Sequence, residues 1–500
     1  MDNKKTENTK IDKKTVTSNL IWRLFERFGV YIISFIISVV LARLLDPKVY
    51  GTVALMTVVI SFLDVFVTGG FANSLIYDKE ATEKDFNTIL WFNICFSIVC
   101  YIILFFVAPL IANYYETPAL TWLIRVAGIS LLVSGIKSLQ YAYIAKNLQF
   151  KKYFIATIGG TIVSGIAGIT MAFLGCGAWA LVAQGVINNV IDTIVLIFVV
   201  KWRPKFEFSF KLLKKHFSFG WKILLYKIVY NISNNARQLF IGKKYSKEDL
   251  AYYNKGKTYP NIIGQNVYNS VNSVMFPVFS KLQDDKKRFN ETILKSLKIN
   301  MFIMLPICLG LFSVSETFIY LLIGEKWLPC VPFVKVFCIV ILFNSIEAIL
   351  SNAPMALGKS TSTMILGIIE CAINIVLLIV AIPFGVMTIG YSMILSSFLN
   401  CLIYFIYIRK ITGLKFSTFI IESFDSLISC VVMGIIVYSV STLDLPFYII
   451  FIMQILVGII SYYVLNKMIK NPALDYCLSL TKSLFKKRKK ANGNNKYMPF

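Results

Sequence analysis

The sequence predicts an all-α integral membrane protein with about fourteen transmembrane helices, and three observations carry this prediction. Of the 500 residues, 57% are hydrophobic and the mean hydropathy is +0.69, whereas soluble domains are about 45–50% apolar. Apolar runs of about 20 residues, the length of helix that crosses a bilayer, recur from end to end. The basic residues between these runs fall mainly on one side of an alternating topology.

The distribution of Lys and Arg predicts the orientation of the chain. If the N-terminus is cytoplasmic, 33 of the 51 basic residues lie in cytoplasmic segments and 5 in external loops. Cytoplasmic loops accumulate Lys and Arg, so both termini are predicted to be cytoplasmic and the number of spans to be even. The same bias explains most of the net charge of +25 without a nucleic-acid partner.

The apolar runs define the individual spans. The eighth run is the least hydrophobic of the set. The predicted spans cover residues 18–44, 50–76, 86–112, 119–144, 154–174, 177–200, 217–241, 250–279, 293–322, 331–356, 361–382, 386–408, 417–441 and 446–466.

A weak internal repeat indicates two pseudo-symmetric six-helix bundles followed by two further helices. VYGTVALMT near Tyr50 resembles AYYNKGKTY near Tyr252, and EKDFNTIL (83–90) resembles KKRFNETIL (286–294) at nearly the same offset. Such repeats are typical of transporters, whose substrate sites lie where the repeats meet. The predicted domains are a cytoplasmic tail (1–17), an N-terminal bundle (18–200), a basic linker (201–216), a C-terminal bundle (217–408), two additional helices (417–466) and a basic cytoplasmic tail (467–500).

The seventh span combines the length of a transmembrane helix with a polar face. At helical spacing Lys227, Asn231, Asn234 and Gln238 share one face, with Arg237 at its edge. A charge at membrane depth costs about 2.5–3.5 kcal/mol on the insertion scale, so such residues usually face protein or a water-filled cavity. This stripe predicts a polar pathway; whether Lys222 joins it or lies at the cytoplasmic interface stays open.

The first span also carries basic residues, and two interpretations remain. Arg23 and Arg27 share a helix face with Tyr31 and are close to Glu26. They either reach back to the cytoplasmic interface or line the same pathway as the cationic seventh span, which opens the second half.

Polar residues in the second and eighth spans extend the predicted pathway. Asp64 lies near the middle of the second span, where a carboxylate either pairs with a cation, the favoured interpretation, or takes part in ion coupling. In the eighth span a stripe of one cation and several amides indicates a hydrated wall more than packing. It consists of Lys257, Asn261, Gln265, Asn269 and Asn272.

Other polar residues are given simpler interpretations. Asp192, Glu347 and Glu370 are lone charges that internal ion pairs would explain, and Lys137 is assigned to a membrane interface. The only histidine, His216, has no Cys/His partners in the sequence, and no P-loop or nucleotide fingerprint is present. No cofactor and no enzymatic activity are therefore predicted, and coupling to H⁺ or Na⁺ stays open.

Several motifs resemble the polysaccharide transporter branch (Wzx-type flippases) of the MOP superfamily, which also holds multidrug extruders and lipid II flippases. One departure is LAYYNKG (250–256), where family members have small residues. The resembling stretches are WRLFERFG (22–29), LARLLDPKVYG (41–51), GCGAWALVAQ (175–184), KWRP (201–204), FSFGWKI (217–223), LFIGKKYSKEDLAYYNKGKTYP (239–260), SVNSVMFPVFSKLQDD (270–285), LLIGEKWLPCVP (321–332) and GVMTIGYSMILS (385–396).

The resemblance implies translocation of a polyprenyl-pyrophosphate-linked oligosaccharide across a bacterial cytoplasmic membrane by alternating access, for capsule, O-antigen or exopolysaccharide synthesis. A polysaccharide polymerase would then be a partner. The expected cationic substrate site consists of Arg23, Arg27, Lys227, Arg237 and Lys257. The expected polar lining consists of Glu26, Asp64, Asn231, Asn234, Asn261, Gln265 and Asn269.

Two alternatives remain open. A multidrug or cation extruder of the same superfamily would favour an acidic, aromatic cavity, and the basic residues here count against it. An intramembrane glycan-modifying enzyme would be expected to have a long external loop with catalytic side chains, and the external loops predicted here are short.

Overall fold

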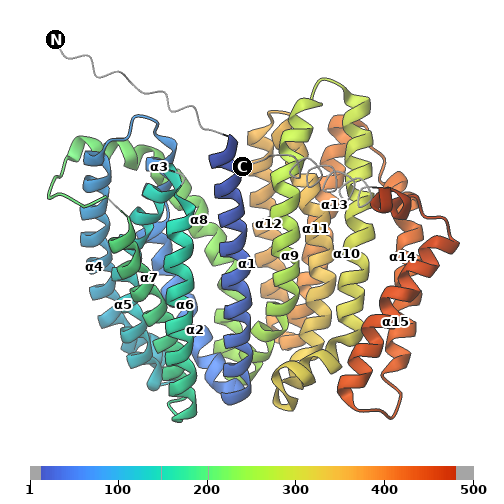
Figure 1. The fold of residues 1–500 in the computed structure, drawn as a ribbon, viewed down its shortest axis with the longest axis horizontal. Coiled ribbons are helices and arrows are strands. Elements are labelled where there is room, and N and C mark those ends of the chain that lie inside the picture. Colours follow the sequence, from blue (N-terminus) through green and yellow to red (C-terminus); the bar gives the residue numbers. More distant parts are fainter. Residues whose placement is uncertain (1–12, 148, 201, 480–500) are drawn as a thin grey trace, which may run out of the picture. The chain divides into compact units, whose positions relative to one another are not determined.

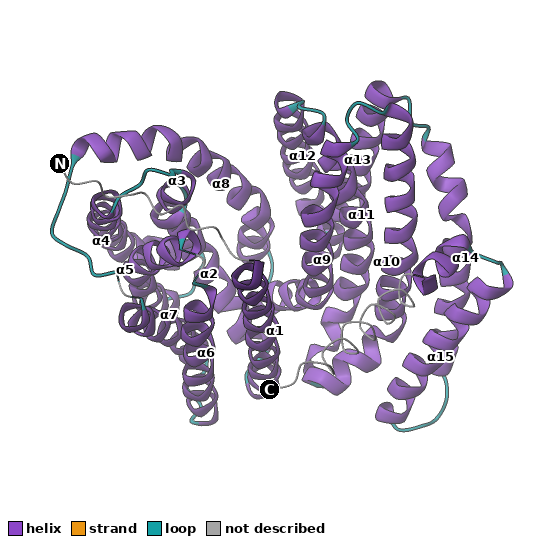
Figure 2. Ribbon diagram, turned by 45° about the horizontal axis from the view of Figure 1, so that its top comes forward, coloured by secondary structure: helices purple, strands orange, loops and turns teal. Residues whose placement is uncertain are grey.

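The computed structural model shows an all-helical protein (Figure 2). It describes residues 13–147, 149–200 and 202–479, with side chains from residue 29 onward apart from a few positions that include Lys222. Within this part of the chain every regular element is an α-helix or a short 3-10 helix, which confirms the predicted fold class.

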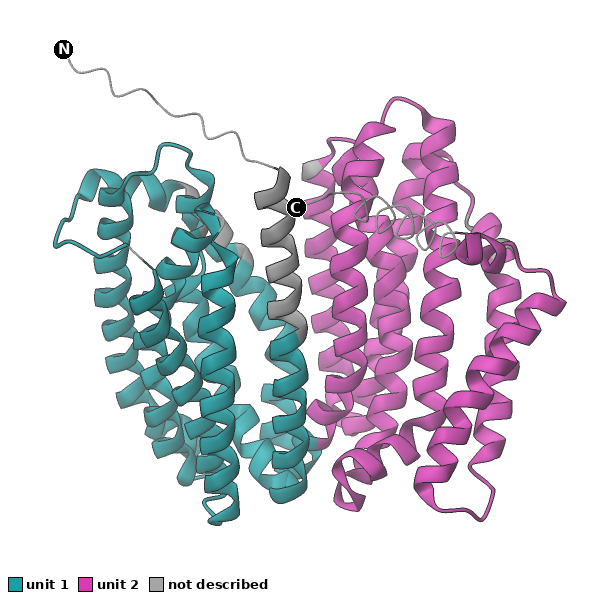
Figure 3. Ribbon diagram, in the orientation of Figure 1, with its two compact units in different colours: residues 1–251 teal, residues 252–500 magenta. Residues whose placement is uncertain are grey.

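The chain divides into two compact units, residues 1–251 and 252–500 (Figure 3). The first unit contains seven complete α-helices after the N-terminal helix α1, and the division falls near the start of α9 (Figure 1). The elements of this unit are α1 (Lys13–Leu44), α2 (Pro47–Thr68), α3 (Phe71–Tyr77), α4 (Glu83–Tyr114), α5 (Ala119–Lys146), α6 (Phe150–Phe173), α7 (Ala178–Val199) and α8 (Phe210–Lys244).

The second unit contains most of α9 and all that follows it. Two helices at its C-terminal end, α14 and α15, pack on α10 and on each other. The elements are α9 (Lys247–Lys281), α10 (Lys286–Ile323), η1 (Glu325–Cys330), α11 (Val331–Ala356), α12 (Ser360–Ala381), η2 (Ile382–Phe384), α13 (Val386–Thr412), α14 (Phe416–Val440) and α15 (Phe447–Met468).

The division by packing differs from the predicted boundary between the bundles. The sequence repeat groups α8 with the second half, but α8 packs against α2, α3 and α4 of the first unit. The repeat in the sequence reflects the order of the helices along the chain. The division by packing instead groups helices that bury surface against one another.

The predicted spans coincide with the long helices of the structure. Eleven of the described helices are long and apolar enough to cross a membrane, so the protein is a multi-pass membrane protein. The long helices outside this set are α8, α9 and α1, whose described apolar part covers Gly29–Leu44. These three are the helices in which the sequence places polar stripes, and the total of fourteen spans stays a prediction.

Packing within each unit repeats as the sequence predicts. In the first unit α4 packs on α5, α5 on α7 and α6 on α7; in the second, α10 packs on α11, α11 on α13 and α12 on α13. The same neighbour relations therefore recur in both halves, which confirms two related bundles.

One predicted span is wrong in its course. The sequence predicts one helix over residues 50–76, but α2 ends at Thr68 and α3 begins at Phe71, with Gly69 and Gly70 between them. Two glycines weaken a helix, and here their lack of side chains also allows the backbone of α8 to approach closely. A Cβ on Gly70 would lie 2.5 Å from the carbonyl oxygen of Gly220 in α8, so a side chain would push α8 away.

Glycines also bring α9 close to α11 in the second unit. A Cβ on Gly256 would lie 2.3 Å from the Cβ of Phe333, and a Cβ on Gly264 would lie 2.9 Å from Ile341. The two glycines are eight residues apart and share one face of α9. The stripe from Lys257 to Gln265 is one residue further round the helix, so close packing on one side leaves an adjacent polar side.

We expect Gly256→Ala to destabilise the second unit by about 1–3 kcal/mol, because the new methyl group overpacks against Phe333. The measurement is thermal unfolding of the purified protein in detergent. Gly310→Ala in α10 is the matched control, since its Cβ would meet nothing within 4 Å. Equal melting temperatures for both variants would contradict the close packing of α9 on α11.

Candidate functional site

An open cavity of about 400 Å³ in the first unit is lined mainly by residues that carry hydroxyl, amide or charged groups. Helices α2, α5, α6 and α7 supply its walls, which carry several hydroxyl groups. Polar groups among apolar spans require partners or water. The side chains that concern the predicted pathway are Thr57, Ser61, Asp64, Lys137 and Asn189.

Lys137 and Asp192 form an ion pair at one wall of this cavity. Lys137 Nζ lies 2.6 Å from Asp192 Oδ2 and also donates to Asn189 Oδ1 at 3.2 Å. The predicted internal pairing of Asp192 is therefore confirmed. The side chain of Lys137 turns toward a carboxylate that is only 2% exposed, and its assignment to a membrane interface stays a prediction.

Asp64 also lines the cavity, from α2. Thr68 Oγ1 approaches its Oδ2 at 3.4 Å, and its negative charge acts on Lys227 of α8. The pairing of Asp64 with a cation stays a prediction.

The polar face of α8 is only partly occupied by its own hydrogen bonds. Asn235 Nδ2 donates to Asn231 Oδ1 at 3.1 Å, and Gln238 Nε2 donates to Asn235 Oδ1 at 3.0 Å. Asn234 is exposed, whereas Lys227 is partly buried. Asn231 and Gln238 of the predicted stripe are thus joined through Asn235, and Lys227 lies one turn before Asn231.

Arg237 differs from the rest of the predicted cationic set because it is buried, with 4% of its surface exposed. It lies on the part of α8 that packs on the first unit, near Gly242, whose Cβ would lie 2.3 Å from Leu55 of α2. The assignment of Arg237 to the cationic substrate site stays a prediction.

The predicted stripe of α9 belongs to the second unit. Gln265 is exposed and donates to Asn269 Oδ1 at 3.4 Å, while Lys257 and Asn261 are partly buried. At the end of the stripe Asn272 accepts a hydrogen bond from Asn352 of α11 at 2.5 Å. Gln265 is the one exposed residue of the five in the stripe and the others are partly buried, so the role of this face as a hydrated wall stays a prediction.

Lys255, which the sequence analysis passed over, is more deeply buried than Lys257. It is 6% exposed, and its ammonium lies 5.5 Å from the ring centroid of Trp327 in η1. The cation–π contact stabilises this buried charge. A lysine two residues from Lys257, on another face of the helix, gave no periodic signal in the sequence.

Three predicted residues, Arg23, Glu26 and Arg27, belong to α1, but their side chains lie outside the described residues. Their assignment to the substrate site stays a prediction, as does the choice between interface and pathway.

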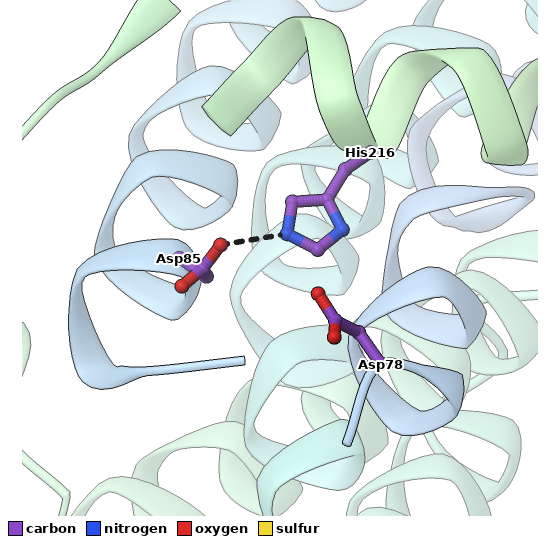
Figure 4. Close-up of side chains that lie close together, drawn as sticks. All are labelled: Asp78, Asp85 and His216. Atoms are coloured by element: carbon purple, nitrogen blue, oxygen red, sulfur yellow. Dashed lines mark hydrogen bonds and ion pairs between the residues drawn. The ribbon is translucent and has the colours of Figure 1, made fainter. Parts of the chain in front are cut away.

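His216 has partners that the sequence did not reveal (Figure 4). Its ring lies between α3 and α4 at the start of α8: Nδ1 is 2.6 Å from Ser74 Oγ and Nε2 is 2.9 Å from Asp85 Oδ1. Asp85 accepts from Nε2, so Nδ1 of the neutral ring accepts from the Ser74 hydroxyl. The ring is 1% exposed, and 142 residues separate Ser74 from His216, so no spacing rule could find this pair.

Asp85 has two tasks in this cluster. Its Oδ2 accepts from the backbone N–H of Thr82 at 2.9 Å and from the Thr82 hydroxyl at 2.6 Å, which caps the start of α4. Its other oxygen holds His216, so the N-terminus of α4 and the N-terminal turn of α8 are joined through one carboxylate.

Asp78 completes the cluster from the end of α3 (Figure 4). Lys215 Nζ lies 2.6 Å from Asp78 Oδ2, and this hydrogen bond lowers the pKa of Asp78 and raises the pKa of Lys215. The potential ligand atoms of Asp78, Asp85 and His216 lie within 4.8 Å of one another. Because Ser74, Thr82 and Lys215 already engage these groups, the arrangement acts as a hydrogen-bonded clasp between α3, α4 and α8.

We expect His216→Ala to destabilise the first unit by about 1–3 kcal/mol, because buried Ser74 and Asp85 would each lose a partner. The measurement is thermal unfolding in detergent, with Lys214→Ala at the neighbouring exposed position as the control. A melting temperature equal to that of the control would show that the clasp contributes no stability.

The fold places the protein in a known structural class. It resembles the lipid II flippase MurJ in an inward closed conformation, with a TM-score of 0.72 and 17% identity over 90% of this chain and 98% of that one. It also resembles an inward-facing multidrug resistance MATE family transporter, with a TM-score of 0.60 and 12% identity over 77% and 94% of the two chains. The chain thus shares its fold with these two proteins.

Within this class the chain belongs to the polysaccharide biosynthesis protein family, whose profile matches residues 40–332. It is 24% identical to the succinoglycan biosynthesis transport protein ExoT of Rhizobium meliloti (strain 1021), over 63% of this chain and 64% of that protein. It is 29% identical to the teichuronic acid biosynthesis protein TuaB of Bacillus subtilis (strain 168), over 56% and 58%. Both alignments span less than two thirds of the relative's length.

A third relative is matched over more of its length. The chain is 24% identical to the lipopolysaccharide biosynthesis protein WzxC of Escherichia coli (strain K12), over 77% of this chain and 79% of that protein. The resemblance seen in the sequence is therefore confirmed at the level of the family.

Proposed function

We propose that this protein is a flippase, which moves a polyprenyl-pyrophosphate-linked oligosaccharide from the inner to the outer leaflet of a bacterial cytoplasmic membrane by alternating access. The observation that carries the proposal is the pair of long polar helices, α8 and α9, in a member of the polysaccharide biosynthesis family. Polar faces at membrane depth are retained where a polar substrate or water must pass.

The headgroup is the part of this substrate that a basic face recognises. A pyrophosphate carries several negative oxygens, and Lys and Arg bind such groups by charge-assisted hydrogen bonds. Lys227 is the cation best placed for this task, because it lies on the partly accessible face of α8. In this proposal Arg23, Arg27, Arg237 and Lys257 complete the cationic set.

The oligosaccharide requires neutral hydrogen-bonding groups. Amide side chains both donate and accept, and α9 presents Asn261, Gln265 and Asn269 along one face with part of their surface accessible. The apolar polyprenyl chain remains in the lipid. No covalent step is needed for this transfer, so the protein acts as a transporter and not as an enzyme.

The orientation follows from the distribution of charge. With both termini cytoplasmic, the basic segments face the compartment in which lipid-linked glycans are assembled, and a polysaccharide polymerase receives the product on the other side. The relatives named for succinoglycan, teichuronic acid and lipopolysaccharide biosynthesis support a glycan as the cargo.

We expect Lys227→Glu to slow flipping at least a hundredfold. A hydrogen bond to a charged group contributes about 1.5–3 kcal/mol, and the reversed charge adds repulsion of the pyrophosphate. The measurement is protection of a fluorescent polyprenyl-pyrophosphate oligosaccharide from an external reagent in proteoliposomes.

Lys244→Glu provides the matched control, because it reverses an exposed lysine at the far end of the same helix. Unchanged flipping by Lys227→Glu, at equal reconstitution, would remove this residue from the substrate site. Transport of cationic drugs without transport of the glycan lipid would instead favour a multidrug extruder.

The amides of α9 allow a separate test of the glycan-binding face. Combined substitution Asn261→Ala, Gln265→Ala and Asn269→Ala should slow flipping roughly ten- to a thousandfold, since each hydrogen bond contributes about 0.5–1.5 kcal/mol. Val274→Ala, at an exposed apolar position of the same helix, is the control. A polyprenyl pyrophosphate without sugars should be flipped equally by both variants; a loss there would contradict a role in glycan binding.

A further inference from the structure

A second open cavity in the first unit lies among three turns that connect predicted spans on the external side. Its volume is about 270 Å³, and it shares no lining residue with the cavity that Asp64 lines. The turns join α1 to α2, α4 to α5 and α8 to α9. The residues that line it are Lys48, Tyr115, Glu116, Gly242, Lys243, Tyr245, Ser246, Lys247 and Glu248. None of them belongs to the predicted substrate site.

Lysines gather at two of these turns. External loops of membrane proteins carry few basic residues, and the sequence places five in the external loops of this chain. Four of the five lie where α1 turns into α2 and where α8 turns into α9, which are equivalent places in the internal repeat. These four are Lys48, Lys243, Lys244 and Lys247, of which Lys244 does not line the cavity. Basic residues that are rare on this side are therefore concentrated at one cavity.

Close packing at a glycine brings the two turns together. A Cβ on Gly51 of α2 would overlap the carbonyl oxygen of Lys247, so the backbone of the turn between α8 and α9 lies directly against α2. Gly51 follows Lys48 by about one helical turn. Lys48 and Lys247 therefore line the same cavity, although they belong to opposite halves of the repeat.

The fold accounts for one of the lining lysines. Lys243 Nζ donates to the carbonyl oxygen of Tyr114 at 2.6 Å, at the C-terminal end of α4. A cation at this end of a helix interacts favourably with the helix dipole. The same ammonium lies 2.9 Å from Glu116 Oε1, and this hydrogen bond lowers the pKa of Glu116. Lys243 and Glu116 thus balance each other.

The other two lining lysines, Lys48 and Lys247, have no such partner. Within the described part of the chain neither ammonium forms a hydrogen bond or an ion pair. Two positive charges at one small cavity repel each other. An anion bound between them would replace this repulsion with two favourable contacts.

The nearby carboxylates do not supply that anion. Asp249 Oδ2 accepts hydrogen bonds from the hydroxyl of Ser246 at 2.7 Å and from its backbone N–H at 3.2 Å, which caps the start of α9. Glu248 lines the cavity from the first turn of α9, where the helix dipole stabilises a carboxylate. It forms no ion pair with a described residue, so Glu248 is the lining group that opposes an anion.

Phosphate is the anion that the position of this cavity favours. The ends of membrane spans lie at the level of the lipid headgroups, where phosphate groups are concentrated. Lysine binds phosphate as a compact charge with three donors. A volume of about 270 Å³ is below the roughly 300–1,000 Å³ of pockets that hold a whole drug-sized ligand. The cavity therefore suits one headgroup more than an oligosaccharide.

We propose that Lys48 and Lys247 form a binding site for one lipid phosphate group at the predicted external face of the first unit. Two lipids present such a group there. One is an anionic phospholipid of the outer leaflet, and the other is the pyrophosphate of the glycan lipid after its transfer. The second source rests on the proposed flippase function, whereas the first does not.

Binding is tested by thermal unfolding of the purified full-length protein in detergent with three probes. Dioctanoyl phosphatidylglycerol represents the phospholipid, inorganic pyrophosphate represents the headgroup of the glycan lipid, and dioctanoylglycerol carries no phosphate. The melting temperature of the wild type should rise with phosphatidylglycerol, with pyrophosphate or with both, and the probe that acts identifies the source. The double variant Lys48→Gln and Lys247→Gln should need at least about tenfold more probe for the same rise, because it loses two charge-assisted hydrogen bonds.

Two matched variants keep this result specific. Lys244→Gln removes a neighbouring exposed lysine that does not line the cavity, so it should bind as the wild type does. Glu248→Gln removes the opposing carboxylate and should need less probe. Other cationic residues also bind phosphate, so only the response that the double variant loses counts toward this site.

Three results would overturn the proposal. They are a wild type that responds to neither phosphate probe, a double variant that responds as the wild type does, and an equal loss of the response to dioctanoylglycerol. Gln retains nearly the length of a lysine side chain without its charge, and both lysines lack partners among the described residues. The double variant should therefore fold as the wild type does.

Flipping measured in proteoliposomes separates this site from the proposed function. Phosphatidylglycerol binding that the double variant loses, in a protein that flips no glycan lipid, would leave the site intact and contradict the proposed function. A protein that flips the glycan lipid, but whose double variant binds every probe as the wild type does, would contradict this site alone.

Discussion

A charge inside an apolar helix bundle has to be neutralised or solvated, and this requirement shapes both units. Desolvation costs a buried ion several kcal/mol unless a partner repays it. In the first unit Lys137 of α5 binds Asp192 and Asn189 of α7 at one wall of the cavity. The same unit joins α3, α4 and α8 through Ser74, His216 and Asp85, whose groups would each be unsatisfied alone. In the second unit the buried ammonium of Lys255 lies 5.5 Å from the centroid of the Trp327 ring.

In the polar helices α8 and α9 the polar side chains are solvated instead, because part of their surface remains accessible. Their amide side chains form hydrogen bonds within the same helix, as between Asn235 and Asn231, and part of the surface of these side chains stays exposed. A helix of 35 residues with such a face gains little from an apolar environment, so its retention among apolar spans indicates a polar cargo. Membership in the polysaccharide biosynthesis family gives that cargo its chemical class in our proposal.

Glycine decides where these helices approach one another. The break at Gly69 and Gly70 lets α8 pass close to the junction of α2 and α3, and Gly256 and Gly264 let α9 lie against α11. Close approach of backbones is a general means of helix association where no hydrophobic gain is available between apolar surfaces. It also fixes the rotation of α9, so that the stripe beginning at Lys257 stays beside the packed face and not within it.

The sequence by itself determined the helical fold class, the position of nearly every long helix and the polar stripes, because these depend on composition and on a period of 3.6 residues along one segment. It also identified Asp192 as a residue that needs a partner. Only the tertiary structure decided who the partners are: Lys137 for Asp192, and Asp85 and Ser74 for His216. These residues are 55 to 142 positions apart in the chain, and no local rule relates them, since their meeting depends on how whole helices pack. The division near Ala251 also depends on helix packing. Helix α8 belongs to the first unit because it packs against α2, α3 and α4, although the sequence repeat groups it with the second half.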